Sequence, residues 1–158
     1  MPEPSRPDDE AHPLVHRLRA LTVELNLLGA EFASRNSLHT TDLRALICLL
    51  DADRAGVRAT PGLLAESLGL TSASTTALVD RLEKAGLIRR SRDVTDRRRV
   101  LLEVTPSAME LGWSFFGPLI RSASETIEGF TPDERSTIER FLLQMTAVAT
   151  ATRVEFAP

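Results

Sequence analysis

Three consecutive arginines, Arg97, Arg98 and Arg99, directly follow Asp96 in the polar segment 93–99. Adjacent guanidinium groups repel one another unless a polyanion lies close by. Arginine also suits the narrow minor groove of DNA, where the negative potential is concentrated. Asp96 would repel phosphate, so we expect it to hold one arginine through a carboxylate–guanidinium fork. The segment therefore predicts a nucleic-acid contact, and the alternative is a solvated run of charge.

A second set of candidate contacts lies upstream, in residues 72–85, where apolar side chains recur at the spacing of one helix face. The opposite face carries small hydroxyl and methyl side chains. Such a face can enter the major groove closely and contact phosphates, base edges or a thymine methyl. The alternative is a solvated helix face. The candidate DNA contacts on this helix and just after it are Ser72, Ala73, Ser74, Thr76, Ala77, Arg81, Lys84 and Arg90.

The charge of the chain is strongly segregated. The net charge of the 158 residues is −3, which taken alone would argue against nucleic-acid binding. Residues 72–99, however, hold eight Lys or Arg against four Asp or Glu, a net charge of +4, whereas residues 103–158 have a net charge of −4. Phosphate binding needs a local basic surface rather than a basic total. The composition is therefore compatible with DNA binding by the middle of the chain.

Other reactive side chains form no convincing site. The single cysteine, Cys48, lies in an apolar stretch, which favours core packing over redox sensing. His12 and His16 could share a helix face, but two ligands without cysteine are weak evidence for zinc, and a polar helix start is favoured. No Ser/His/Asp constellation, glycine-rich phosphate loop or pair of acids on a shared face is present. We expect no enzymatic activity, no cofactor and no metal site.

The elements that would position the candidate residues are mostly helical. Helices are expected over 14–34, from Thr40 or Thr41 to about 52, and over 61–69, 72–85, 106–129 and 132–152. Residues 87–104 place apolar and β-branched side chains around a charged centre, which predicts two strands joined by an exposed loop. Gly117-Pro118 should kink the fifth helix. Two short helices followed at once by a basic hairpin predict a winged helix-turn-helix.

The helices at both ends of the chain carry apolar stripes that have no partner in such a core. Leucines recur through 14–34, and a second stripe runs through 138–148. We therefore expect a homodimer joined by residues 13–35 and 106–153, around a winged helix-turn-helix core at 38–104. These segments form a single domain at 13–158, after a disordered tail at 1–12. Trp113 and the Phe115-Phe116 pair favour packing between subunits over a ligand box.

The segment LLAESLGLTSASTTALVDRLEKAGLIRRSRDVTDRRRVLLEVTPSAMEL combines a short helix, a longer helix ending in LEK-x-GL and a D-x-x-D-R-R wing. It resembles the MarR family of regulators closely over residues 38–111, and the outer helices resemble it in order and length. Val94 replaces a frequent proline, and Val104-Thr105 replaces Leu-Thr. The resemblance implies a homodimer on a pseudo-palindromic operator, with Arg98 in the minor groove and Asp96 as its orienting partner. It also implies a small effector, often aromatic or anionic, bound between the dimer helices and the winged core.

We therefore expect a cytoplasmic, ligand-responsive repressor that binds double-stranded DNA as a homodimer. No signal peptide is recognisable, and the apolar runs are far shorter than the ~20 residues of a membrane span. One alternative is a sensor on the same fold switched by redox at Cys48 or by metal at His12 and His16. Another is a winged helix used for protein docking, which would need an exposed apolar patch instead of an arginine wing. No residue is assigned to the effector site.

Overall fold

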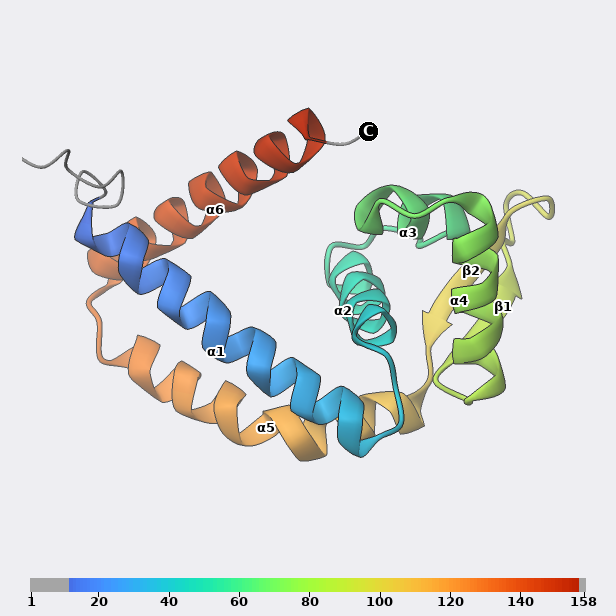
Figure 1. Ribbon diagram of the computed structural model, residues 1–158, viewed down its shortest axis with the longest axis horizontal. Coiled ribbons are helices and arrows are strands. Elements are labelled where there is room, and N and C mark those ends of the chain that lie inside the picture. Colours follow the sequence, from blue (N-terminus) through green and yellow to red (C-terminus); the bar gives the residue numbers. More distant parts are fainter. Residues whose placement is uncertain (1–11, 157–158) are drawn as a thin grey trace, which may run out of the picture.

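The computed structural model describes residues 12–156 (Figure 1). Within this range the order is α1 (Pro13–Arg35), α2 (Thr40–Arg54), α3 (Pro61–Leu68), α4 (Ser72–Lys84), β1 (Ile88–Arg92), β2 (Val100–Val104), α5 (Pro106–Glu128) and α6 (Pro132–Glu155). The predicted mainly helical fold with one hairpin is confirmed. The predicted disordered tail lies outside the described residues, except for His12, which caps α1.

Threonine hydroxyls mark where the later helices begin. Each hydroxyl accepts a hydrogen bond from the backbone amide three residues on, which satisfies a donor that has no partner inside the helix. The capping threonines of α3, α4, α5 and α6 are Thr60, Thr71, Thr105 and Thr131. The start of α2 differs from the prediction of Thr40 or Thr41, because His39 is the capping residue. The Asp42 carboxylate accepts the His39 amide at 2.8 Å there.

The hydrophobic core lies between α2, α3, α4 and the hairpin. Leu64, Leu78 and Leu82 are fully buried there, with Ile88 and Leu102 from the two strands. The strands pair antiparallel, from Ile88 opposite Val104 to Arg92 opposite Val100. The amide of Leu102 also donates to the Ala59 carbonyl at 3.0 Å, so β2 is bonded to the segment between α2 and α3. In this core the strand β1 packs against α4, so that the hairpin and α4 are neighbours (Figure 1).

The end helices α1, α5 and α6 form an arm beside this core (Figure 1). Phe32 of α1 packs against Phe115 and Phe116 of α5, with ring centroids 5.2 and 5.0 Å away. The two phenylalanines were expected to pack between subunits. Within the chain they contact Phe32 near the end of α1, and a contact with a second subunit remains a prediction. Trp113 remains half-exposed. The helix α5 runs across Gly117-Pro118 without ending and continues to Glu128.

The arm presents apolar side chains that nothing in the described chain covers. Leu21 of α1 is 54 % exposed and Leu142 of α6 is 49 % exposed. Over its whole length α6 contains no buried residue. Near its end it is bonded to the core, where Arg153 donates to the Ser67 carbonyl at 2.8 Å. Among the helices of residues 12–156, none has the length and apolar character to cross a membrane.

Candidate nucleic-acid interface

The outward face of α4 is built as the sequence predicts. The buried residues of α4 are Thr75, Leu78, Val79 and Leu82. The five small side chains of the predicted reading face are all exposed: Ser72, Ala73, Ser74, Thr76 and Ala77. The Thr76 hydroxyl donates to the Ser72 carbonyl at 2.9 Å, while the Ser74 hydroxyl accepts from Thr71 at 2.9 Å. Thr76 therefore offers an acceptor and a methyl group outward, and Ser74 retains a proton to donate.

Arg81 has a partner within the protein. Its Nε and Nη2 atoms lie 3.0 and 2.6 Å from Oδ1 of Asp42, whose side chain is only 1 % exposed. This two-atom contact ties the last turns of α4 to the first turn of α2. The hydrogen bonds that Arg81 donates to the Asp42 carboxylate raise the pKa of Arg81. Arg81 was predicted to contact DNA, and the structure gives its guanidinium a structural bond instead, so a DNA contact remains a prediction.

We expect Arg81→Met to lower the free energy of unfolding by ~1–3 kcal/mol, because it leaves the buried Asp42 carboxylate without its cation. Chemical denaturation measures this change. Arg54→Met is the matched control, since Arg54 and Asp51 form an exposed pair whose loss should cost ~0–1 kcal/mol. Equal, small losses in the two variants would show that the Arg81–Asp42 contact does not stabilise the fold.

Arg90 and Lys84, the two candidate phosphate contacts, differ in their surroundings. The Arg90 guanidinium on β1 bonds to both Asp80 and Glu83 of α4. The hydrogen bonds that Arg90 donates, above all the one to Asp80, raise the pKa of Arg90. A phosphate would have to compete with two carboxylates for Arg90. Lys84 is exposed and forms no ion pair within residues 12–156, so it is the better placed of the two for a phosphate.

The loop of the hairpin, residues 93–99, is the wing. The Asp93 amide donates to the Arg99 carbonyl at 3.1 Å, and the Arg99 amide donates to the Asp96 carbonyl at 2.9 Å. Asp96 was expected to grip the Arg98 guanidinium, but its Oδ1 instead accepts the backbone amide of Arg98 at 3.0 Å. The expected fork is therefore replaced by an Asx turn, in which a short side chain bonds the backbone two residues on. Asp96 fixes the backbone of the wing rather than the Arg98 side chain.

The three wing arginines are not equivalent. Arg97 and Arg98 are exposed and form no ion pair within the described residues, whereas Arg99 Nη1 lies 3.9 Å from Asp93 Oδ2. The loop that carries Arg97 and Arg98 joins β1 to β2, and β1 packs against α4 (Figure 1). This arrangement can meet the major groove with a helix and an adjacent minor groove with arginine.

Asp93 is a buried centre of the wing that was not among the predicted site residues. Its Oδ1 accepts the Thr95 amide at 2.8 Å, the Thr95 hydroxyl at 2.7 Å and Nη1 of Arg58. The hydrogen bonds from Thr95, followed by that from Arg58, hold the pKa of Asp93 well below its usual range against the opposing effect of burial. An aspartate two residues before a threonine is a local turn signal. Arg58, 35 residues away in the sequence, gives no such signal.

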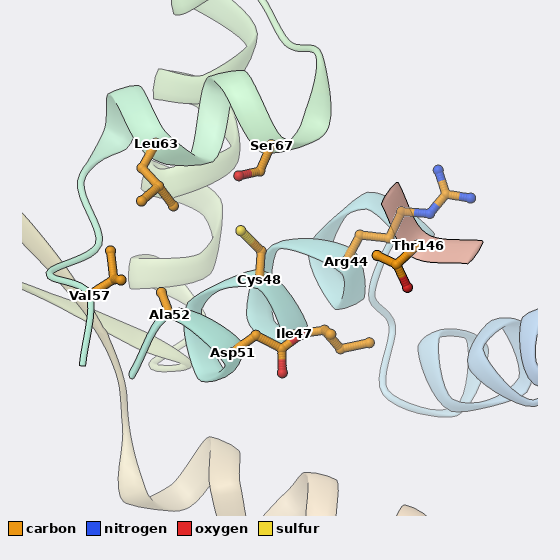
Figure 2. Close-up of a pocket in the computed structure, with 9 residues that line it drawn as sticks. All are labelled: Arg44, Ile47, Cys48, Asp51, Ala52, Val57, Leu63, Ser67 and Thr146. Carbon is orange, nitrogen blue, oxygen red and sulfur yellow. The ribbon is translucent and has the colours of Figure 1, made fainter. Parts of the chain in front are cut away.

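The residues of the alternative sensors lie away from this surface. Cys48 is half-buried on α2, packs against the core, and borders a cavity of about 600 Å³ that also touches α3 and Thr146 of α6 (Figure 2). Its sulfur has no second cysteine to pair with. The Nδ1 atom of His12 accepts the Leu14 amide at 3.2 Å, which is a helix-capping role. Within residues 12–156, no three potential metal ligands are gathered together.

A second cavity, of about 610 Å³, lies between the arm and the core. It is lined by α2 residues that include Leu46 and Leu50, by Trp113 and Phe116 of α5, and by Phe32 of α1. Arg54 and Asp51 at its border pair with each other at 3.1 Å. This apolar cavity, between the arm and the winged core, lies in the region where the family resemblance implies an effector site.

Comparisons with known proteins agree with this geometry. The family model of the MarR family matches residues 38–100. The HTH-type transcriptional regulator YcgE of Bacillus subtilis is 34% identical over 128 residues, which are 81% of this chain and 80% of that protein.

Two proteins of known structure share the fold. A mutant of MepR from S. aureus has a TM-score of 0.71 at 18% identity, covering 87% of this chain and 98% of that one; MepR has also been solved bound to an oligodeoxyribonucleotide. BpsR of Bordetella bronchiseptica has a TM-score of 0.53 at 21% identity, and the match covers 91% of this chain and 98% of that one. The DNA binding of BpsR is regulated by 6-hydroxynicotinic acid. Together with the winged core, the reading face of α4 and the arginine wing, these matches show that the chain belongs to the MarR family of transcriptional regulators.

Proposed function

We propose that this chain is a repressor that binds a pseudo-palindromic operator as a homodimer and releases it when a small molecule binds. The observation that carries the proposal is the exposed hydroxyl face of α4 beside the unpaired Arg97 and Arg98. In this proposal α4 reads bases in the major groove and the wing enters the adjacent minor groove. The related MepR bound to an oligodeoxyribonucleotide supports it. The protein acts in the cytoplasm, and no catalytic step is needed.

The dimer would form through the arm. The exposed leucines of α1 and the uncovered α6 are the apolar surface that a second copy would bury, at ~25 cal/mol per Å². A two-fold axis through the arm would present two α4 helices to successive major grooves, ~10 bp apart. Operator palindromy would then mirror the symmetry of the protein.

The cavity beside Trp113 and Phe116 is the proposed effector site. It is apolar and large enough for an aromatic molecule, and regulation of BpsR by 6-hydroxynicotinic acid supports such a ligand class. Trp113 is the single tryptophan of the chain, so its fluorescence reports on this cavity. A panel of aromatic acids and amines can be screened for quenching, for a raised melting temperature and for release of operator DNA. Quenching without release would argue against an effector role.

Mutations should distinguish base recognition by Thr76 from phosphate contact by Lys84. We expect Thr76→Ala to reduce the preference for operator over scrambled DNA, because Thr76 faces the bases in this proposal. Lys84→Ala should weaken binding to both DNAs alike and flatten the salt dependence by about one unit, since one phosphate contact is lost. Fluorescence anisotropy on the two DNAs across a salt series measures both effects. An unchanged preference in Thr76→Ala would show that the reading face is wrongly assigned.

A further inference from the structure

We infer that Arg58 is a positioning residue for the wing: through Asp93 it fixes where Arg97 and Arg98 meet DNA, without contacting DNA itself. Arg58 lies between α2 and α3, outside both the reading face and the arginine run. The inference rests on the proposed entry of the wing into the minor groove. It assigns a DNA-binding role to a residue that the sequence pattern of the wing does not include.

The geometry joins this segment to the wing at two points. Arg58 Nη1 bonds to Asp93 Oδ1 and lies 3.4 Å from the Thr95 hydroxyl. One residue on, the Ala59 carbonyl accepts the Leu102 amide of β2 at 3.0 Å. The ion pair holds the start of the wing loop, and the backbone bond holds the strand that follows it. The segment before α3 thus fixes the position of the wing through these two bonds.

The position of the wing depends on the Arg58 cation because its partner, Asp93, is buried. The Asp93 side chain is fully buried, whereas that of Arg58 is 51 % exposed. The other carboxylate oxygen, Oδ2, has no hydrogen-bond partner among the described residues, and Arg99 Nη1 lies 3.9 Å from it. A buried carboxylate that loses its cation must take up a proton, approach another cation or move into solvent. The hydrogen bonds from Thr95 hold the pKa of Asp93 low and so disfavour the uptake of a proton, which leaves the other two responses.

Both responses change the wing. An approach of Arg99 would draw the end of the loop towards Asp93. Exposure of Asp93 would break the hydrogen bond from its backbone amide to the Arg99 carbonyl, which closes the loop. In either case the backbone that carries Arg97 and Arg98 moves. Groove contacts tolerate little displacement because arginine recognition depends on direction. Loss of Arg58 should therefore lower the affinity for DNA by displacing Arg97 and Arg98.

A direct phosphate contact by the half-exposed Arg58 is the rival explanation, and a mutant cycle separates the two. Operator affinity is measured by fluorescence anisotropy for Arg58→Met in the wild-type background and in an Arg97→Ala/Arg98→Ala background. We expect about tenfold weaker binding in the first background and a change within about twofold in the second. Arg58→Lys, which keeps a cation for Asp93, should restore most of the affinity. Equal losses in both backgrounds, or no loss in the first, would overturn the inference.

Folding and wing order need their own controls. Arg58→Met/Asp93→Asn removes both charges and leaves no unpaired buried carboxylate, so it should fold. It also lacks the ion pair that holds the start of the wing loop, so it should lose affinity as Arg58→Met does. Amide hydrogen exchange should become faster at residues 94–99 in both variants but not in α4. Arg58→Lys, which keeps a cation for Asp93, should leave exchange at residues 94–99 close to that of the wild type. If Arg97→Ala/Arg98→Ala also leaves affinity unchanged, the proposed wing contact fails; if that variant weakens binding and Arg58→Met does not, only the present inference fails.

Discussion

Leu142→Asp should turn the proposed dimer into a folded monomer. Operator binding should weaken by about 10²- to 10⁴-fold, because each subunit then binds DNA without a second, linked subunit. Leu142 is half-exposed on a helix that buries nothing in its own chain, so an aspartate there does not disturb the core. In the proposed dimer it would place a charge inside an apolar interface, where an unpaired carboxylate is strongly unfavourable. Analytical ultracentrifugation and anisotropy on full-length operator measure the two effects.

Ala147→Asp is the matched control, since helical spacing places Ala147 on the side of α6 away from the apolar stripe. It should leave both the dimer and the affinity intact. Circular dichroism checks that each variant remains folded. A wild-type protein that sediments as a well-folded monomer at micromolar concentration would refute the proposed dimer, whatever the variants do.

Arg98→Ala should weaken operator binding by ~1–3 kcal/mol, the range for an arginine that contacts a groove. The structure makes the expectation for Asp96 sharper, because this carboxylate bonds the Arg98 amide rather than its guanidinium. Asp96→Ala removes the Asx turn and should weaken binding, although it also deletes a negative charge near DNA. Asp96→Asn keeps an acceptor oxygen and removes only the charge. It should bind as tightly as the wild type or more tightly at low salt.

The measurement is operator affinity over a salt series for Asp96→Ala, Asp96→Asn and Arg98→Ala, with a double-mutant cycle between Asp96→Ala and Arg98→Ala. Coupling between the two alanine variants is expected, since the turn matters only while Arg98 is present to be placed. Tighter binding by Asp96→Ala, or strictly additive losses, would mean that the wing acts as a diffuse basic patch.

The fold could be predicted from the sequence because its signals are local. Threonine followed by proline or by small residues begins four of the helices, and apolar periodicity separates the core face of α4 from its outer face. The Asx turn at Asp96 was also within reach of local rules, since aspartate often bonds the amide two residues on. The alternation of charges in the wing suggested an ion pair there instead.

The contacts that hold the reading elements in place could not be predicted in this way. Arg81 meets Asp42 across 39 residues, and Arg58 meets Asp93 across 35. Neither pair follows from helical or strand spacing, because each depends on how α2 packs against the rest of the core. Phe115 and Phe116 illustrate the same limit: an aromatic pair signals burial, but only the position of α1 decides that Phe32 is its neighbour.

The helix α2 is attached to the two DNA-reading elements at opposite ends. Asp42 in its first turn holds α4, and Arg58, just beyond its last turn, holds the wing. Its 15 residues give a rod ~22 Å long. A tilt of ~10° about its midpoint therefore carries each end ~2 Å, in opposite directions. Such a rotation would shift α4 and the wing against each other. In the proposed complex with DNA, a half-site that fits one of them would then no longer fit the other.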